Sequence, residues 1–262
     1  MKKFTILVLA LASFAVNAQT ISNNLSGYFQ NSKKDALYSS IYLDGKGHAI
    51  ISDSFSAEYF QKEDTLYVFP DKSVFIFKLE KGKLKGLSSW VEKNTFKQTT
   101  TPNEEEIASF DSSKIDPELL YEYYKLNYTD GTDEVSFYAF ENEQDYLKKT
   151  EELCNKGLTS ACGAYFGMLY IESSGGLSSI LGENEEASFK ENPKMEKIAN
   201  KMISLNDMRG YSLLGSYYYA LGNTDKAMEL YNEGAEKGDY NSNLILMEQE
   251  LNKMIDEYEE TE

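Results

Sequence analysis

The sequence predicts an α+β protein, in which a small N-terminal antiparallel β domain is followed by a C-terminal α-helical repeat domain, an α/α solenoid. Two observations lead to this fold class. Residues 25–96 contain short apolar runs with period-two alternation, separated by turn signals, as antiparallel strands do. Residues 211–239 instead repeat their apolar positions with a helical period and break at Gly222, as a helical hairpin does.

The N-terminal segment is expected to be a secretory signal peptide covering residues 1–18. Two lysines precede a thirteen-residue apolar run, and small residues follow at a typical cleavage site. The run is too short to favour a membrane span, and an uncleaved anchor is the alternative. No cysteine lies near the cleavage point, so a lipid anchor is not expected. The mature chain would begin at Gln19 and be extracytoplasmic, either periplasmic or secreted.

The composition restricts the partners of the mature chain. Removal of the two signal-peptide lysines changes the net charge from −17 to −19. Nucleic acid and anionic membrane surfaces would repel such a protein, so neither is expected as a partner, whereas a basic partner is allowed. The 20 tyrosines and 14 phenylalanines supply enough apolar surface for two cores or for an exposed binding face.

Residues 19–98 are expected to form the β domain. Runs of β-branched and aromatic residues at 65–69 and 74–79 flank Pro70 and predict a hairpin. Further strands are predicted at residues 27–29, 38–43, 48–52 and 84–90. Together they predict a meander of six to eight short strands that curls into a small barrel-like sheet. This hairpin rhythm resembles the small lipocalin-like lipoprotein domains of bacterial envelopes, although no residue motif accompanies it.

Residues 99–116 are polar and acidic and are predicted to be a linker. The helical domain is then expected to span residues 117–262. Pro117 favours a helix start with Asp116 as its cap, and the alternative for the following segment is one arm of a hairpin. The run 175–193 is predicted to be an exposed loop that interrupts the helical hairpins.

The helical pattern is clearest between residues 214 and 235. Small residues occur where two antiparallel helices must approach closely, and large ones occur where the gaps between helices must be filled. Gly222 predicts the end of the first helix, and Asn223 or Thr224 predicts the cap of the second. The residues expected to pack in this way are Leu214, Gly215, Tyr218, Ala227, Tyr231 and Ala235.

At these six positions the chain resembles the tetratricopeptide repeat family, and the exit at residues 235–239 is similar to the Sel-one-like branch of that family. A looser copy at residues 153–170 departs from the pattern, because Phe166 stands where the family has a small glycine. The resemblance implies a stacked array of hairpins with a concave groove for a protein or peptide. The alternative is an ordinary amphipathic helix pair.

Cys154 and Cys162 are the only cysteines of the chain. In a secreted protein a single even pair predicts a structural disulfide, and the helical pattern places one cysteine at each side of a turn. A redox-active pair would more often show Cys-x-x-Cys, which is absent. The spacing is also similar to that of the secreted, cysteine-rich members of the Sel-one-like family.

No catalytic, cofactor-binding or metal-binding residues are predicted. His48 is the only histidine, and strand alternation with turns suffices to place Asp44 and Ser52 near it. One histidine and a disulfide pair cannot form a zinc site of ordinary spacing. Some cysteine-rich Sel-one-like proteins are linked to β-lactam binding or hydrolysis, but no serine here has a lysine three residues later.

The expected function is protein–protein interaction outside the cytoplasm, without enzymatic activity, cofactor or membrane span, and with an unknown protein or peptide partner. The candidate partner-binding residues are Tyr211, Tyr217 and Tyr219, because tyrosine combines a flat apolar body with a polar tip. Packing within the helical domain is the alternative role for Tyr217 and Tyr219. Two other functions are a ligand-binding β domain with the helices as a docking arm, and an envelope hydrolase with carboxylates in a cleft between the halves.

Overall fold

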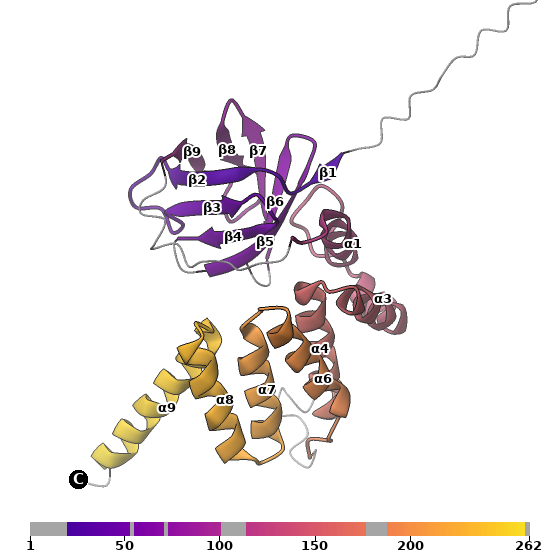
Figure 1. The fold of residues 1–262 in the computed structure, drawn as a ribbon, viewed down its shortest axis with the longest axis vertical. Coiled ribbons are helices and arrows are strands. Elements are labelled where there is room, and N and C mark those ends of the chain that lie inside the picture. Colours follow the sequence, from indigo (N-terminus) through magenta and orange to yellow (C-terminus); the bar gives the residue numbers. More distant parts are fainter. Residues whose placement is uncertain (1–19, 53–54, 71–72, 101–113, 177–187, 260–262) are drawn as a thin grey trace, which may run out of the picture.

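The structure is a computed structural model that describes residues 20–52, 55–70, 73–100, 114–176 and 188–259 (Figure 1). The expected signal peptide, most of the expected linker and the centre of the expected loop at 175–193 lie outside the described residues. No described helix combines the length and the apolar character needed to cross a membrane.

The strand-rich half comes first along the chain. Its strands are β1 (Ile21–Ser22), β2 (Ser26–Asn31), β3 (Ser40–Asp44), β4 (His48–Ile51), β5 (Phe55–Lys62), β6 (Thr65–Phe69), β7 (Phe75–Glu80), β8 (Lys83–Gly86) and β9 (Thr95–Thr99). Each strand from β2 to β9 pairs antiparallel with the next, and β9 pairs back onto β2. In the described part of the chain these eight strands therefore form a closed up-and-down barrel, and β1 adds to the end of β5.

Period-two alternation sorts the side chains of the barrel into two cores. In β6, Leu66 and Val68 point into the barrel, whereas Tyr67 and Phe69 point outward and are nevertheless buried. Helices cover this part of the outer wall (Figure 1), which explains why the sequence of β6 is a nearly continuous apolar run. The barrel interior is filled by large side chains, including Phe29, Phe77 and Phe96.

The helical half follows. Its helices are α1 (Pro117–Asn127), α2 (Tyr138–Glu141), α3 (Glu143–Asn155), α4 (Thr159–Ser173), α6 (Pro193–Ser204), α7 (Arg209–Ala220), α8 (Thr224–Glu236) and α9 (Tyr240–Glu259). Two predicted boundaries are confirmed. The side chain of Asp116 accepts a hydrogen bond from the backbone N–H of Glu118 at the start of α1, and Asn223 caps α8 through the N–H of Lys226. Gly222 between α7 and α8 has φ +79°, a conformation that favours glycine.

The predicted fold class is wrong, although strands followed by helices agree in part. The strand-rich region predicted to curl into a barrel-like sheet is a closed eight-stranded barrel, but the structure does not show the predicted α/α solenoid. The physical reason is that the spacing from Leu214 to Ala235 specifies contacts inside one hairpin only. The apolar faces of the helices belong to one hydrophobic cluster with Phe60, Tyr67 and Phe69 of the barrel wall, so they do not serve only to stack hairpins.

The predicted disulfide is present between Cys154, in the last turn of α3, and Cys162, in the first turns of α4. Both residues are buried, and the bridge closes the turn between the two helices. An oxidised cysteine pair is compatible with an oxidising, extracytoplasmic compartment. The bond fixes α4 at the point where this helix meets the barrel.

We expect the double substitution Cys154→Ala and Cys162→Ala to lower the free energy of unfolding by about 2–3 kcal/mol, because the short loop no longer restricts the unfolded chain. Urea denaturation measures the loss. Wild-type protein treated with dithiothreitol is the matched control and should lose nearly the same amount. A double variant far less stable than the reduced wild type would show that sulfur packing, rather than the bond, supplies the stability.

Candidate functional site

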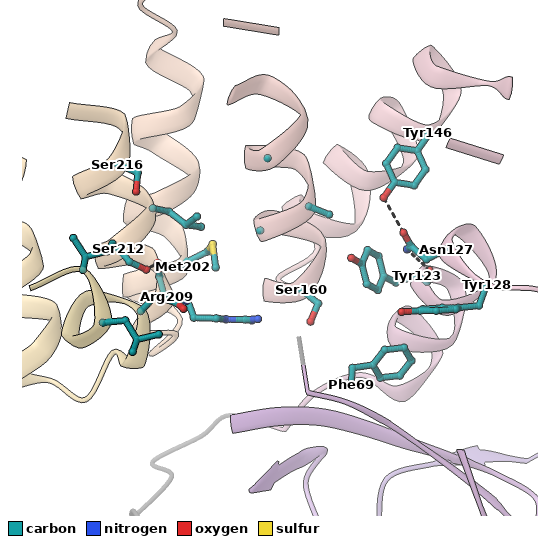
Figure 2. A pocket seen from close by; sticks show the side chains of 17 residues that line it. Phe69, Tyr123, Asn127, Tyr128, Tyr146, Ser160, Met202, Arg209, Ser212 and Ser216 are labelled. Carbon is teal, nitrogen blue, oxygen red and sulfur yellow. Dashed lines mark hydrogen bonds between the residues drawn. The ribbon is translucent and has the colours of Figure 1, made fainter. Parts of the chain in front are cut away.

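A cavity lies where the barrel meets the helices. It has a volume of about 700 Å³ and is lined from α1, α3, α4, α6, α7, α9 and strand β6 (Figure 2). Its walls differ in character. Helix α4 contributes only small residues to the lining, whereas the side formed by α1 and α3 carries mostly aromatic ones. This volume falls within the range of about 300–1,000 Å³ that is common for ligand pockets.

The small residues of α4 create the cavity. Ser160, Gly163, Ala164 and Gly167 are spaced by three and four positions, so they share one face of the helix. A Cβ atom placed on Gly167 would meet no atom within 4 Å, and one on Gly163 would touch only the end of Met202, at 3.9 Å. These two glycines are therefore not required for close packing of α4, and they leave the helix backbone accessible from the cavity.

A hydrogen-bonded group forms the opposite wall. The Tyr146 hydroxyl of α3 donates to Oδ1 of Asn127 at 2.9 Å, and Nδ2 of Asn127 donates to the carbonyl oxygen of Tyr123 at 2.8 Å. The first bond holds the end of α1 against α3, and the second, within α1, orients the Asn127 amide (Figure 2). Tyr128 and Phe69 extend the wall toward the barrel. The aromatic wall is consequently held in place before any ligand binds.

The Tyr123 hydroxyl is a polar group of the cavity lining. The Tyr123 ring lies between α1 and α4 in Figure 2, and its hydroxyl makes no hydrogen bond with the described residues. Burial raises the pKa of Tyr123, and the nearby Tyr146 and Glu58 raise it further. The hydroxyl therefore stays protonated and can both donate and accept a hydrogen bond.

Arg209, the charged residue of the cavity lining, is paired. The guanidinium of Arg209, at the start of α7, donates three hydrogen bonds to the Asp207 carboxylate, the shortest from Nη2 at 2.6 Å. Burial by itself raises the pKa of Asp207, but the Arg209 guanidinium outweighs this effect and lowers the pKa below its usual range. The guanidinium points toward Ser160 in Figure 2. The ion pair gives the site an ordered polar edge without a large net charge.

Glu58 joins the barrel to this site. It is buried on the outer face of β5 and accepts hydrogen bonds from the hydroxyls of Thr159 and Ser160, the Thr159 bond measuring 2.9 Å. Helix α4 has no side-chain cap of its own, since Leu158 stands at the cap position. The barrel thus supplies the negative charge that the start of this helix favours.

The predicted packing residues meet at the contact of α7 and α8. Leu214, Ala227 and Tyr231 are buried, while Tyr218 and Ala235 are half-buried. A Cβ atom on Gly215 would lie 2.4 Å from the Tyr231 ring, so glycine is required there. None of these side chains lines the cavity.

The candidate partner-binding tyrosines differ in their exposure to solvent. Tyr211 and Tyr217 are buried, at 5% and 2% exposure, and Tyr211 donates from its hydroxyl to Glu233. Neither presents a surface to a partner. Tyr219 is 56% exposed but lies outside the cavity lining. His48 is half-buried in β4, and its backbone N–H donates to the Asp44 carboxylate.

The sequence interpretation missed the residues that line the cavity. Two signals could have indicated them: the small residues at 160, 163, 164 and 167, and the tyrosines at 123 and 128. Neither pattern by itself tells a cavity wall from a packed core. Within the described ranges, no group of three or more His, Cys, Asp or Glu side chains is arranged to hold a metal ion.

The geometry defines a class of protein: a closed eight-stranded meander barrel joined to α-helical hairpins, with a cavity at the junction. Comparisons with protein-family models, with curated proteins and with solved structures found no match. The functional argument therefore depends on the cavity and its surroundings.

Proposed function

We propose that this protein is an extracytoplasmic protein–protein interaction module that holds a segment of a partner protein in the cavity between the barrel and the helices. The main support for this proposal is that one wall of the cavity carries small residues and the facing wall carries aromatic ones. The glycines of α4 let another backbone approach closely, and the facing aromatic wall with the Tyr123 hydroxyl offers contact area and a hydrogen bond.

A peptide segment suits this cavity better than a small enclosed ligand. Leu244 of α9 lines the cavity and is also 44% exposed, so an occupant can continue from the cavity along α9. Small-ligand binding inside the barrel has less support, because Phe29, Phe77 and other core residues fill the interior. The secreted or periplasmic location belongs to the same proposal and is supported by the disulfide.

The proposal is tested by filling the cavity. Peptides would be selected from a random phage-displayed library on the whole mature protein, and their affinity measured by calorimetry. Gly167→Leu should weaken the selected peptides at least about tenfold, because the leucine side chain occupies their space. Glu172→Leu, on an exposed position of α4 outside the cavity, is the matched control and should leave the affinity unchanged.

Circular dichroism and thermal unfolding should show that Gly167→Leu is folded, since helix propensity favours leucine over glycine. Peptides that bind Gly167→Leu as tightly as wild type would exclude the cavity as their site. The proposal would also fail if the selected peptides bound Glu172→Leu as weakly as Gly167→Leu.

A further inference from the structure

Helix α9 carries an apolar surface that the other described elements leave largely exposed. Its twenty residues pack against α7 and α8 near the start, and the C-terminal half extends beyond α8 (Figure 1). Six of its large apolar side chains are between 44% and 66% exposed. They are Tyr240, Leu244, Met247, Leu251, Met254 and Ile255.

These six residues, here called the α9 stripe, lie on one side of the helix. Successive members from Tyr240 to Met254 are four, three, four and three positions apart, which is the spacing of a helix-pairing seam. The opposite side is the one that packs. Ser242 is fully buried, and Ile245 and Leu246 are half-buried. The stripe is therefore not the face that attaches α9 to the protein.

The stripe starts at the barrel and passes the cavity. The ring of Tyr240 meets the ring of Phe55 of β5 edge-on, with centroids 5.5 Å apart. Leu244, the next residue of the stripe, lines the cavity. The stripe is thus continuous with the surface that we assign to partner binding, and it offers a straight helical track beyond the cavity.

Acidic residues border the stripe on both sides. At about 100° per residue, Glu248 and Glu250 project about 80° to either side of the direction of Tyr240, and both are exposed. Lys253 projects about 140° away from that direction, toward the other side of the helix. The sequence from 256 to 262 adds five acidic residues and no basic one.

We propose that the α9 stripe binds a basic amphipathic helix of a partner protein, an inference that rests on the proposed interaction function. Leucine or methionine side chains of the partner pack on the stripe, and its flanking lysines or arginines pair with Glu248 and Glu250. A second copy of the chain is disfavoured because it would bring acidic borders together. An anionic membrane surface is disfavoured for the same reason.

The test measures fluorescence anisotropy of a labelled model peptide with the whole mature protein at low and high salt. The probe is a leucine–lysine peptide with leucines at helical three- and four-residue spacing. A scrambled peptide of the same composition and a leucine–glutamate peptide with the same leucine spacing are the controls. We expect the probe to bind at least about tenfold more tightly than either control, and its affinity to fall as salt rises.

Two variants separate the apolar and the charged contributions. Met247→Ser with Leu251→Ser should weaken the probe at least about tenfold, and Glu248→Gln with Glu250→Gln should weaken it and reduce its salt dependence. Lys253→Gln, on the same helix but off the stripe, should not weaken it. The stripe residues are exposed, so the substitutions leave the core intact.

Three outcomes would overturn the inference. If the scrambled peptide bound as tightly as the probe, the attraction would come from net charge alone. If the leucine–glutamate peptide bound as tightly as the probe, a basic partner would be excluded. Sedimentation that shows a dimer in the wild type, lost in the Met247/Leu251 variant, would make a second copy the occupant. Gly167→Leu distinguishes the two proposals. It should weaken binding of the peptides selected for the cavity but leave the affinity for the leucine–lysine probe unchanged.

Discussion

Replacing Phe60 with alanine is expected to lower the free energy of unfolding by about 3–5 kcal/mol. Phe60 is fully buried on the outer face of β5. Its ring stacks on Tyr67 at 4.7 Å between centroids and meets Tyr121 and Tyr124 of α1 edge-on, at 5.6 and 5.9 Å. Removal of the ring leaves a cavity among aromatic neighbours from two parts of the protein, and rigid rings close such a space poorly.

Urea denaturation followed by circular dichroism measures the loss, and Phe77→Ala is the matched control. Phe77 is equally buried but lies inside the barrel, so its loss should be similar in size. Hydrogen exchange should distinguish the two variants, since only Phe60→Ala should speed exchange of the α1 amides. A loss below about 1 kcal/mol for Phe60→Ala would contradict a core shared by barrel and helices.

Individual strands and helices could be predicted from the sequence where the apolar residues lie on one face of the element. The hairpin of residues 65–69 and 74–79 corresponds closely to β6 and β7, and the cap at Asp116 starts α1. Turn residues and period-two alternation act over a few neighbouring positions, so a short stretch of sequence is enough to predict the strands and turns that they form. The number and closure of the strands depend on the pairing of β2 with β9, which is a long-range contact.

The arrangement of the helices could not be predicted in the same way. Gly215 and Tyr231 are in contact because α7 and α8 pack closely in one hairpin, and the spacing of small and large residues along the sequence predicts this contact. Nothing in the spacing shows that Tyr67 and Phe69 of the barrel wall are partners of the helices. The family resemblance therefore predicts a solenoid but not the contact with the barrel.

The candidate site was missed for a related reason. The chemistry of tyrosine predicts binding residues at these positions, but Tyr211 and Tyr217 are packing residues, as their burial shows. The cavity arises where α4 has glycines and no neighbour fills the space. Absence of a neighbouring side chain is a property of the assembled fold, and a linear pattern of small residues predicts close packing just as well.

The last prediction concerns the contact that fixes α4 to the barrel. Glu58→Ala is expected to lower the free energy of unfolding by about 2–4 kcal/mol, because two hydrogen bonds to a charged group and the charge at the start of α4 are lost together. Glu58→Gln should lose less, since its amide oxygen can still accept one of the two hydroxyl hydrogens. Urea denaturation of both variants measures the difference.

Glu80→Ala is the control, because Glu80 is an exposed carboxylate at the end of β7 and its loss should stay within about 0.5 kcal/mol. The hydroxyl of Ser160 faces both Glu58 and the cavity, so Glu58→Ala should also weaken peptides selected for the cavity. If Glu58→Ala lost no more stability than Glu80→Ala, water would hydrogen-bond the hydroxyls of Thr159 and Ser160 as well as Glu58 does. The position of α4, and with it the shape of the cavity, would then depend on the aromatic cluster around Phe60 and on the Cys154–Cys162 bridge.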